Sequence, residues 1–75
     1  MPKVRVMFSY TLDTIAEPII YTMSQQFNLI TNIRQADLTE NRGWIILDLD
    51  GDKKNIDTAL AWVTSKGVRV DVVED

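Results

Sequence analysis

Alternating apolar and polar positions mark both ends of the chain as strands. Residues 4–8 place an apolar side chain at every second position, and residues 68–72 repeat this pattern with valines. A period of two is typical of a strand that buries one face and exposes the other. The sequence therefore predicts a first strand near the N-terminus and a last strand near the C-terminus.

A longer period follows the first strand and predicts an amphipathic helix. Its apolar stripe recurs at every fourth residue, with Ile15, Ile19, Met23 and Phe27. Thr14 and Glu17 have the spacing of a capping box, in which each side chain caps a backbone N–H group at the start of the helix. Pro18 is expected in the first turn, where a missing N–H group costs little.

A second helix is predicted between two capping residues, Asp52 and Gly67. Asp52 is expected at the N-terminal cap, and Gly67 is expected just beyond the C-terminal end. Between them the apolar positions follow the spacing of one helical face, with Ile56, Ala59, Leu60 and Val63.

Two strands fill the space between these helices. The turn residues Asn41-Arg42-Gly43 precede residues 44–50, where Ile45, Leu47 and Leu49 face the core, and Asp48 and Asp50 face outward. In the strand before this turn, Leu29, Thr31 and Ile33 share one face, while Ala36 and Leu38 fall on the opposite one. A bulge of one residue near Ile33-Arg34 would return all five to the same side.

The resulting order is strand, helix, strand, strand, helix, strand. Right-handed crossovers place both helices on one face of a four-stranded antiparallel sheet. The predicted fold is therefore an α+β, ferredoxin-like βαββαβ plait, formed by residues 1–75 as a single domain.

Composition excludes several classes of function. The chain has no cysteine and no histidine, which removes thiolate metal sites, iron–sulfur ligation, disulfides and the commonest general base. Eleven acidic residues against eight scattered basic ones give a net charge of −3, which argues against nucleic-acid binding. No apolar run approaches the length of a membrane span. We expect a cytoplasmic protein without catalytic residues, metal or cofactor.

Two features of the sequence indicate binding. Asn32 stands between Thr31 and Ile33, although asparagine is disfavoured inside strands. It is either an exposed edge residue or an amide that donates and accepts hydrogen bonds at a ligand or subunit contact. The second feature is apolar: the two tryptophans, Trp44 and Trp62, and the aliphatic Ile46 are candidates for an interface, either with a second copy or with a partner protein.

The chain resembles the NIL domain, which is best known as the C-terminal regulatory domain of the ATP-binding subunit of methionine ABC transporters. The likeness runs from about Val4 to Val73 and is carried by Phe27, Asn32, Ile33, Ala36, Gly43, Gly51, residues 59–63 and residues 67–72. This resemblance implies a ferredoxin-like domain that forms a homodimer and binds methionine near the dimer interface. It places the ligand-contacting asparagine at Asn32, with Ile33 as an apolar wall.

Arg34 departs from the family pattern, in which an apolar residue stands at this position. Its guanidinium could bind a ligand carboxylate in a bidentate fork, it could block the pocket, or it could simply be solvated. Two functions therefore remain open. One is a regulatory homodimer that binds an amino acid such as methionine near Asn32, Ile33 and Arg34. The other is a ligand-free interaction module that acts on a transporter subunit or an iron–sulfur protein.

Overall fold

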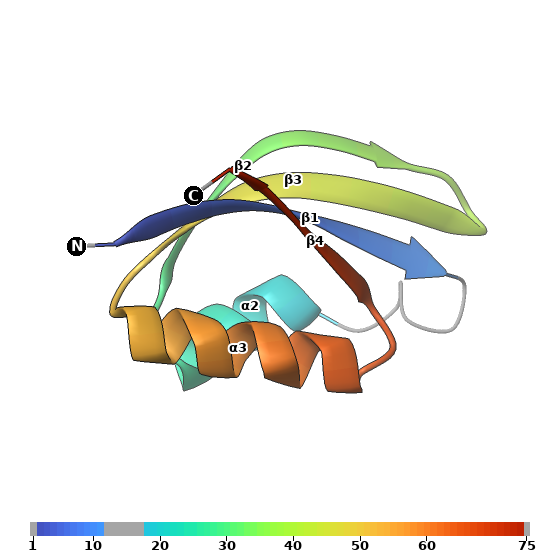
Figure 1. The fold of residues 1–75 in the computed structure, drawn as a ribbon. Coiled ribbons are helices and arrows are strands. Elements are labelled where there is room, and N and C mark those ends of the chain that lie inside the picture. The colour runs from blue at the N-terminus through green and yellow to red at the C-terminus, as the bar shows by residue number, and fades with distance from the viewer. Residues whose placement is uncertain (1, 12–17, 75) are drawn as a thin grey trace.

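The computed structural model describes residues 2–11 and 18–74, and it has the predicted order of elements. Figure 1 shows a curved sheet lying over two helices. The elements are β1 (Lys3–Thr11), α2 (Ile19–Gln26), β2 (Ile30–Leu38), β3 (Arg42–Asp50), α3 (Lys53–Ser65) and β4 (Arg69–Glu74).

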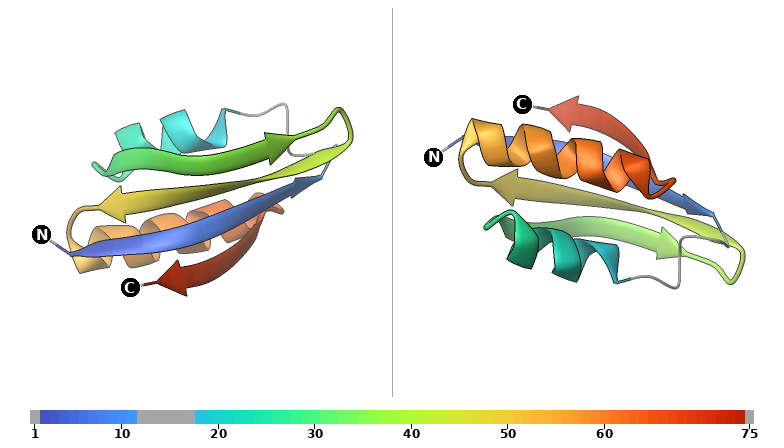
Figure 2. Two further views of the ribbon diagram at one scale, coloured as in Figure 1. Left: turned by 90° about the horizontal axis from the view of Figure 1, so that it is seen from above. Right: turned by 90° about the horizontal axis from the view of Figure 1, so that it is seen from below.

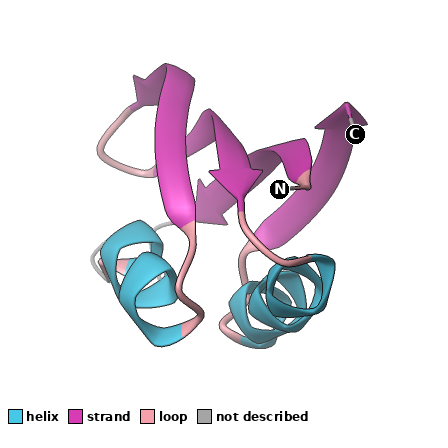
Figure 3. Cartoon of the chain, turned by 90° about the vertical axis from the view of Figure 1, so that its left-hand side faces the viewer, coloured by secondary structure: helices cyan, strands magenta, loops and turns pink. Residues whose placement is uncertain are grey.

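The sheet is antiparallel throughout, with the strand order β2-β3-β1-β4. Strands β2 and β4 therefore form its two edges (Figure 2). Both helices lie on the same side of the sheet (Figure 3), which confirms the ferredoxin-like plait. No described element covers the other side, which we call the open face. Its side chains include Arg5, Met7, Ser9, Asn32, Arg34, Gln35, Asp37, Trp44, Ile46, Asp48 and Asp71.

The hydrophobic core lies between the sheet and the helices. Every second side chain of β1 and β3 points into the core from the sheet. The apolar stripes of α2 and α3 face these side chains from the helix side. The buried apolar residues are Val6, Phe8, Tyr10, Ile19, Met23, Leu29, Ile45, Leu47, Leu49, Ile56, Ala59, Val63 and Val68.

The predicted bulge in β2 is confirmed. Ile33 pairs with Leu47 and Gln35 pairs with Ile46, so Arg34 between them has no partner residue in β3. This extra residue keeps both halves of β2 in phase with the core face of β3. Thr31, Ile33, Ala36 and Leu38 consequently share the helix side of the sheet.

Two asparagines, Asn28 and Asn32, lie close together after helix α2. The motif that ends α2 explains the first of them. Asn28 has a φ of 53°, in the left-handed region. The N–H group of Leu29 donates to the carbonyl of Ser24 at 3.1 Å, which is the long hydrogen bond of a Schellman motif. Asparagine tolerates this conformation better than most residues. Asn28 thus fills the position that glycine usually takes.

The beginnings of the helices differ from the sequence prediction. Helix α2 begins at Ile19, so Pro18 precedes it instead of lying in its first turn; the predicted capping box, Thr14 and Glu17, lies outside the described residues. Asp52 does occupy the N-cap of α3, but its side chain makes no capping hydrogen bond. Gly67 follows α3 with a φ of 90°, as expected for a C-terminal cap.

Two asparagine substitutions are expected to separate structural from binding roles. Asn28→Ala should lower the free energy of unfolding by about 1 kcal/mol, because alanine is strained in the left-handed region. Asn28→Gly should preserve stability. Asn32→Ala, at an exposed edge position, should change it by less than about 0.5 kcal/mol. Urea denaturation measures the free energy of unfolding of all three variants. Equal losses for Asn28→Ala and Asn32→Ala would contradict this assignment.

Candidate functional site

The structure brings two of the three predicted ligand residues together. Asn32 pairs with Asp48 of β3 and lies on the open face. Arg34, the bulge residue, also turns to the open face, where its Nε lies 3.9 Å from an Asp48 carboxylate oxygen. Ile33 lies on the opposite face, across from buried Leu47. A ligand on the open face would therefore need its apolar wall from other residues.

Asp48 is the centre of this arrangement. It lies on the open face as predicted, yet it is only 3% exposed. Arg5 covers it from β1, with Nε 2.8 Å from Oδ1 and Nη2 3.4 Å from Oδ2. Arg34 approaches the same carboxylate from the other side. A buried carboxylate therefore holds two guanidinium groups that come from the strands on either side of it.

The arginines keep Asp48 ionised. The hydrogen bond from Arg5 is the main reason that the pKa of Asp48 lies below its usual value; burial opposes this shift, and the charges of Arg5, Arg34 and Lys3 support it. The Arg34 side chain stays half exposed beside this carboxylate. A guanidinium in that position can bind an anionic group of a ligand.

A hollow of about 370 Å³ adjoins this cluster on the open face. Arg34 and Gln35 provide polar groups, whereas Ile46 and Val73 provide an apolar surface beside them. Its lining residues are Arg5, Arg34, Gln35, Ile46 and Val73. The hollow thus combines groups that bind a carboxylate with groups that bind an aliphatic side chain.

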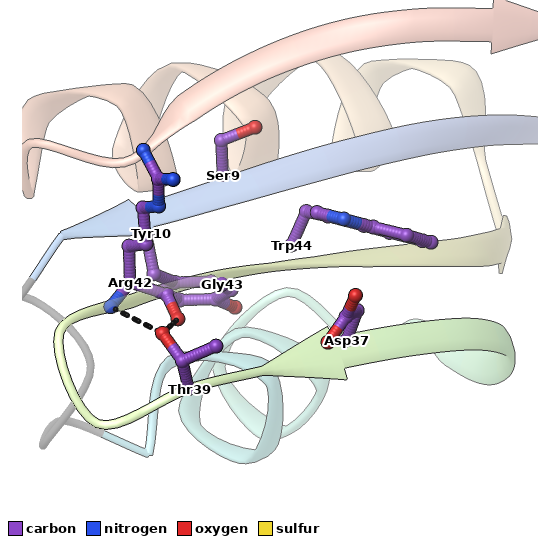
Figure 4. A pocket seen from close by; sticks show the side chains of 7 residues that line it. All are labelled: Ser9, Tyr10, Asp37, Thr39, Arg42, Gly43 and Trp44. Atoms are coloured by element: carbon purple, nitrogen blue, oxygen red, sulfur yellow. Dashed lines mark hydrogen bonds between the residues drawn. The ribbon is translucent and has the colours of Figure 1, made fainter.

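A second hollow, of about 420 Å³, lies at the hairpin end of the open face. Figure 4 shows Ser9, Trp44 and Asp37 on β1, β3 and β2, with the hairpin beside them. Thr39 shapes this end, because its hydroxyl donates to the Arg42 carbonyl at 2.8 Å. Sequence analysis did not single out Asp37. Its alternation with Ala36 and Leu38 after the bulge was a signal for its place on the open face, but not for its neighbour Trp44.

The predicted interface residues occupy two different surfaces. Trp44 and Ile46 are half-buried on the open face. Trp62 lies on the helix side, where its ring is 5.8 Å from that of Phe27 in an edge-on arrangement. The Lys66 ammonium lies 5.3 Å from the Trp62 ring centre, which is within the range of a cation–π contact. Trp62 thus has contacts within the molecule.

Exposed apolar residues gather at the β2 edge. Ile30, Ile33 and Leu38 of β2 are 66%, 54% and 53% exposed, and Tyr21 of the neighbouring α2 is 68% exposed. The β4 edge carries a smaller pair, Val72 and Val73. A sheet edge with exposed apolar residues is a surface that readily pairs with another chain.

A comparison with models of known protein families decides which family the chain belongs to. The model of the NIL domain matches residues 4–72. The chain belongs to the NIL domain family. This membership supports a small regulatory domain. Among curated protein sequences, none matches the chain.

Solved structures agree with the NIL domain fold. The C-terminal domain of an ABC transporter ATP-binding protein from Enterococcus faecalis superposes with a TM-score of 0.83 at 20% identity, covering 93% of this chain and 82% of that one. Prephenate dehydratase from Streptococcus mutans superposes with a TM-score of 0.60 at 17% identity, covering 93% of this chain and 40% of that one. The de novo designed protein Ferredog-Diesel superposes with a TM-score of 0.51 at 12% identity, covering 97% of this chain and 85% of that one.

Two further features concern metal binding and membrane insertion in the described part of this NIL domain. No three acidic side chains there are grouped so that they could hold a metal ion. Neither α2 nor α3, the two described helices, is long and apolar enough to cross a membrane.

Acid should weaken the Asp48 cluster. Because the pKa of Asp48 is lowered in the folded protein, its contribution to stability is present above the unfolded value of about 3.9 and is lost as the pH falls toward the folded value. Asp48→Asn should therefore be less stable than the wild type at pH 7, and this difference should shrink below about pH 4.

Urea midpoints of the wild type and Asp48→Asn at neutral and acidic pH measure this effect. Asp57→Asn is the matched control, because Asp57 forms an exposed pair with Lys53 on α3, with an N–O distance of 2.9 Å. Exposed pairs contribute little to stability, so this variant should follow the wild type. A difference for Asp48→Asn that is the same at both pH values would contradict the assignment.

Proposed function

We propose that this NIL domain is a non-enzymatic regulatory homodimer that binds a small amino acid such as methionine at Asn32 and Arg34. The observation that carries the proposal is the placement of both side chains on the open face, next to the buried carboxylate of Asp48. The Arg34 Nε lies 3.9 Å from an Asp48 oxygen, and its side chain is half exposed. Its guanidinium is therefore accessible to a ligand on the open face.

The chemistry of these groups suits the carboxylate of an amino acid. A guanidinium forms two parallel hydrogen bonds to a carboxylate, and the Asn32 amide can donate another. Ile46 and Val73 lie beside Arg34 in the first hollow and offer an apolar surface to an aliphatic or thioether side chain. Arg34 therefore acts as a binding group and not as an obstruction.

Regulation would follow from binding at a subunit contact. A ligand that binds the dimer better than the monomer shifts the equilibrium toward the dimer by mass action. The Enterococcus faecalis relative is described as a C-terminal domain of an ABC transporter ATP-binding protein. By analogy, the partner of this domain would be a transporter component, whose activity changes with the assembly state of the domain.

Saturating L-methionine is expected to raise the melting temperature of the wild-type protein by several degrees. A ligand present at a hundred times its Kd stabilises the folded state by about 2.7 kcal/mol, and each kcal/mol raises the midpoint of a small domain by about 4–8 °C. Asn32→Ala and Arg34→Gln should abolish this shift. Their melting temperatures without ligand should stay close to that of the wild type, since both positions are exposed.

Thermal melting against the twenty amino acids and S-adenosylmethionine, with the solution mass recorded in parallel, tests this proposal. Thr58→Ala is a control for the substitutions, because Thr58 is an exposed position on α3, far from the open face in the fold. A folded protein whose melting temperature no amino acid changes would rule the proposal out.

The second candidate is a ligand-free module that docks a transporter subunit or an iron–sulfur protein. The half-buried apolar side chains of Trp44 and Ile46 on the open face favour it. In this case Trp44→Ala or Ile46→Ala would abolish capture of the partner, and methionine would have no effect. Trp62→Ala is less informative, because it also removes the contact with Phe27.

A further inference from the structure

The hollow at the hairpin end of the open face is a site that the proposed function does not use. It has a volume of about 420 Å³ and shares no lining residue with the hollow beside Arg34. Its lining comes from β1, β2 and β3 and from the turn between β2 and β3. We call it the hairpin hollow.

Asp37 and Arg42 bring opposite charges to the hairpin hollow. Asp37 lies opposite Trp44 in the β2–β3 pair, and Arg42 precedes Trp44 by two residues on β3. The two charged residues are therefore diagonal neighbours, whose Cα atoms are about 7–8 Å apart and whose side chains could meet. Neither side chain, however, forms an ion pair or a hydrogen bond with another residue in the described part of the chain.

The orientation of Arg42 explains why the two charges do not pair. In Figure 4 its guanidinium points toward Ser9 on β1 and away from Asp37 on β2. Trp44 lies in the row between Asp37 and Ser9, because it pairs with both of them. The hairpin hollow thus has an anion-binding side, a cation-binding side and an aromatic surface.

We propose that the hairpin hollow is a second binding site, complete within one copy of the chain, for a small zwitterion with an aromatic side chain. Asp37 binds the ammonium group of this ligand, and Arg42 with the Ser9 hydroxyl binds its carboxylate. The ligand ring packs on Trp44. An aromatic amino acid has this chemistry. The inference goes beyond the proposed function, since it requires neither Arg34 nor a second copy.

Two unpaired charges of opposite sign favour a ligand that carries both charges. A simple anion bound by Arg42 would lie near the Asp37 carboxylate, and a simple cation bound by Asp37 would lie near the Arg42 guanidinium. A zwitterion meets each group with the opposite charge. Arg69, which pairs with Ser9 from β4, is already in an ion pair with Asp71 at 3.1 Å.

Trp44 provides the preference for an aromatic ring. Its side chain is half-buried, so part of the indole remains accessible to a ligand. Aromatic rings pack on one another in offset-stacked or edge-on arrangements, and an indole face also attracts an ammonium group. The hollow beside Arg34 instead has the aliphatic side chains of Ile46 and Val73. The two hollows therefore differ in the side chain that they favour.

The turn fixes the backbone of the hairpin hollow before a ligand binds. The Thr39 hydroxyl donates to the Arg42 carbonyl at 2.8 Å and accepts from the Arg42 N–H group at 3.2 Å. At Gly43 a Cβ atom would come within 2.9 Å of the Asp37 carbonyl oxygen, so glycine allows β2 to lie close to β3 here. A backbone that is already in place lowers the entropy cost of binding.

The fluorescence of Trp44 tests the site directly, because the chain has only two tryptophans. In Trp62→Phe, Trp44 is the only tryptophan, and phenylalanine at position 62 keeps an aromatic ring next to Phe27. L-Phenylalanine is expected to change the Trp44 emission until the site is saturated. L-Leucine should bind about two- to tenfold more weakly, because it lacks a ring to pack on the indole. No saturable change with L-phenylalanine would overturn the inference.

Calorimetric titration of the wild type and its variants with L-phenylalanine tests the two charges. Asp37→Asn and Arg42→Gln should each raise the Kd by about tenfold or more, because each removes a charge that pairs with the ligand. Both positions are exposed, so the melting temperatures without ligand should stay close to that of the wild type.

The matched controls are Asp57→Asn and Lys53→Gln, which remove the two members of an exposed ion pair on α3 and should leave the Kd unchanged. Phenylalanine methyl ester and N-acetylphenylalanine each lack one charge and should bind at least about tenfold more weakly than L-phenylalanine. An unchanged Kd in both Asp37→Asn and Arg42→Gln would overturn the inference.

The outcomes also separate this inference from the proposed function. In Arg34→Gln the effect of methionine should be lost, while the response of Trp44 to L-phenylalanine remains. Loss of both would place phenylalanine in the hollow beside Arg34 and overturn the inference. Wild-type protein that binds methionine but not phenylalanine would overturn the inference alone. Protein that binds phenylalanine at Trp44 and shows no effect of methionine would support the inference and contradict methionine as the ligand beside Arg34.

Discussion

One extra residue in an edge strand determines much of this structure. Without the bulge at Arg34, the alternation of β2 would put Ile33 and Ala36 on opposite faces, and half of the strand would lose its match to the core face of β3. The bulge removes this conflict and leaves one residue outside the ladder. That residue is an arginine, and the open face is where a charged side chain can reach both solvent and the carboxylate of Asp48.

Asp48 shows how a charge can be buried on a sheet face that no helix covers. The side chains of Arg5 and Arg34 lie on either side of its carboxylate. The hydrogen bond from Arg5 compensates for the lost hydration of this buried group. Buried ion pairs of this kind are weak evidence for stability. Their clearer consequence here is positional, since the Asp48 carboxylate of β3 lies within ion-pair distance of Arg5 on β1 and of Arg34 on β2.

The period of the apolar pattern was sufficient to predict the fold, including the bulge, because each strand and helix buries one face against a single core. Asn32 was singled out because asparagine is unusual in a strand, and its neighbour Asn28 proved to have a local role in ending α2. The burial of Asp48 could not be predicted, since it depends on which residues of β1 and β2 lie beside it. Asp37 was missed for the same reason: its neighbour Trp44 is set by strand pairing and not by local sequence.

The departure of Arg34 from the NIL pattern is therefore compatible with the NIL fold. A guanidinium in place of an apolar residue would be costly if that position faced the core, but the bulge directs the side chain to the open face, where it is half exposed. The guanidinium therefore adds no charge to the core between sheet and helices, and it changes the charge of the open face next to Asn32 and Asp48.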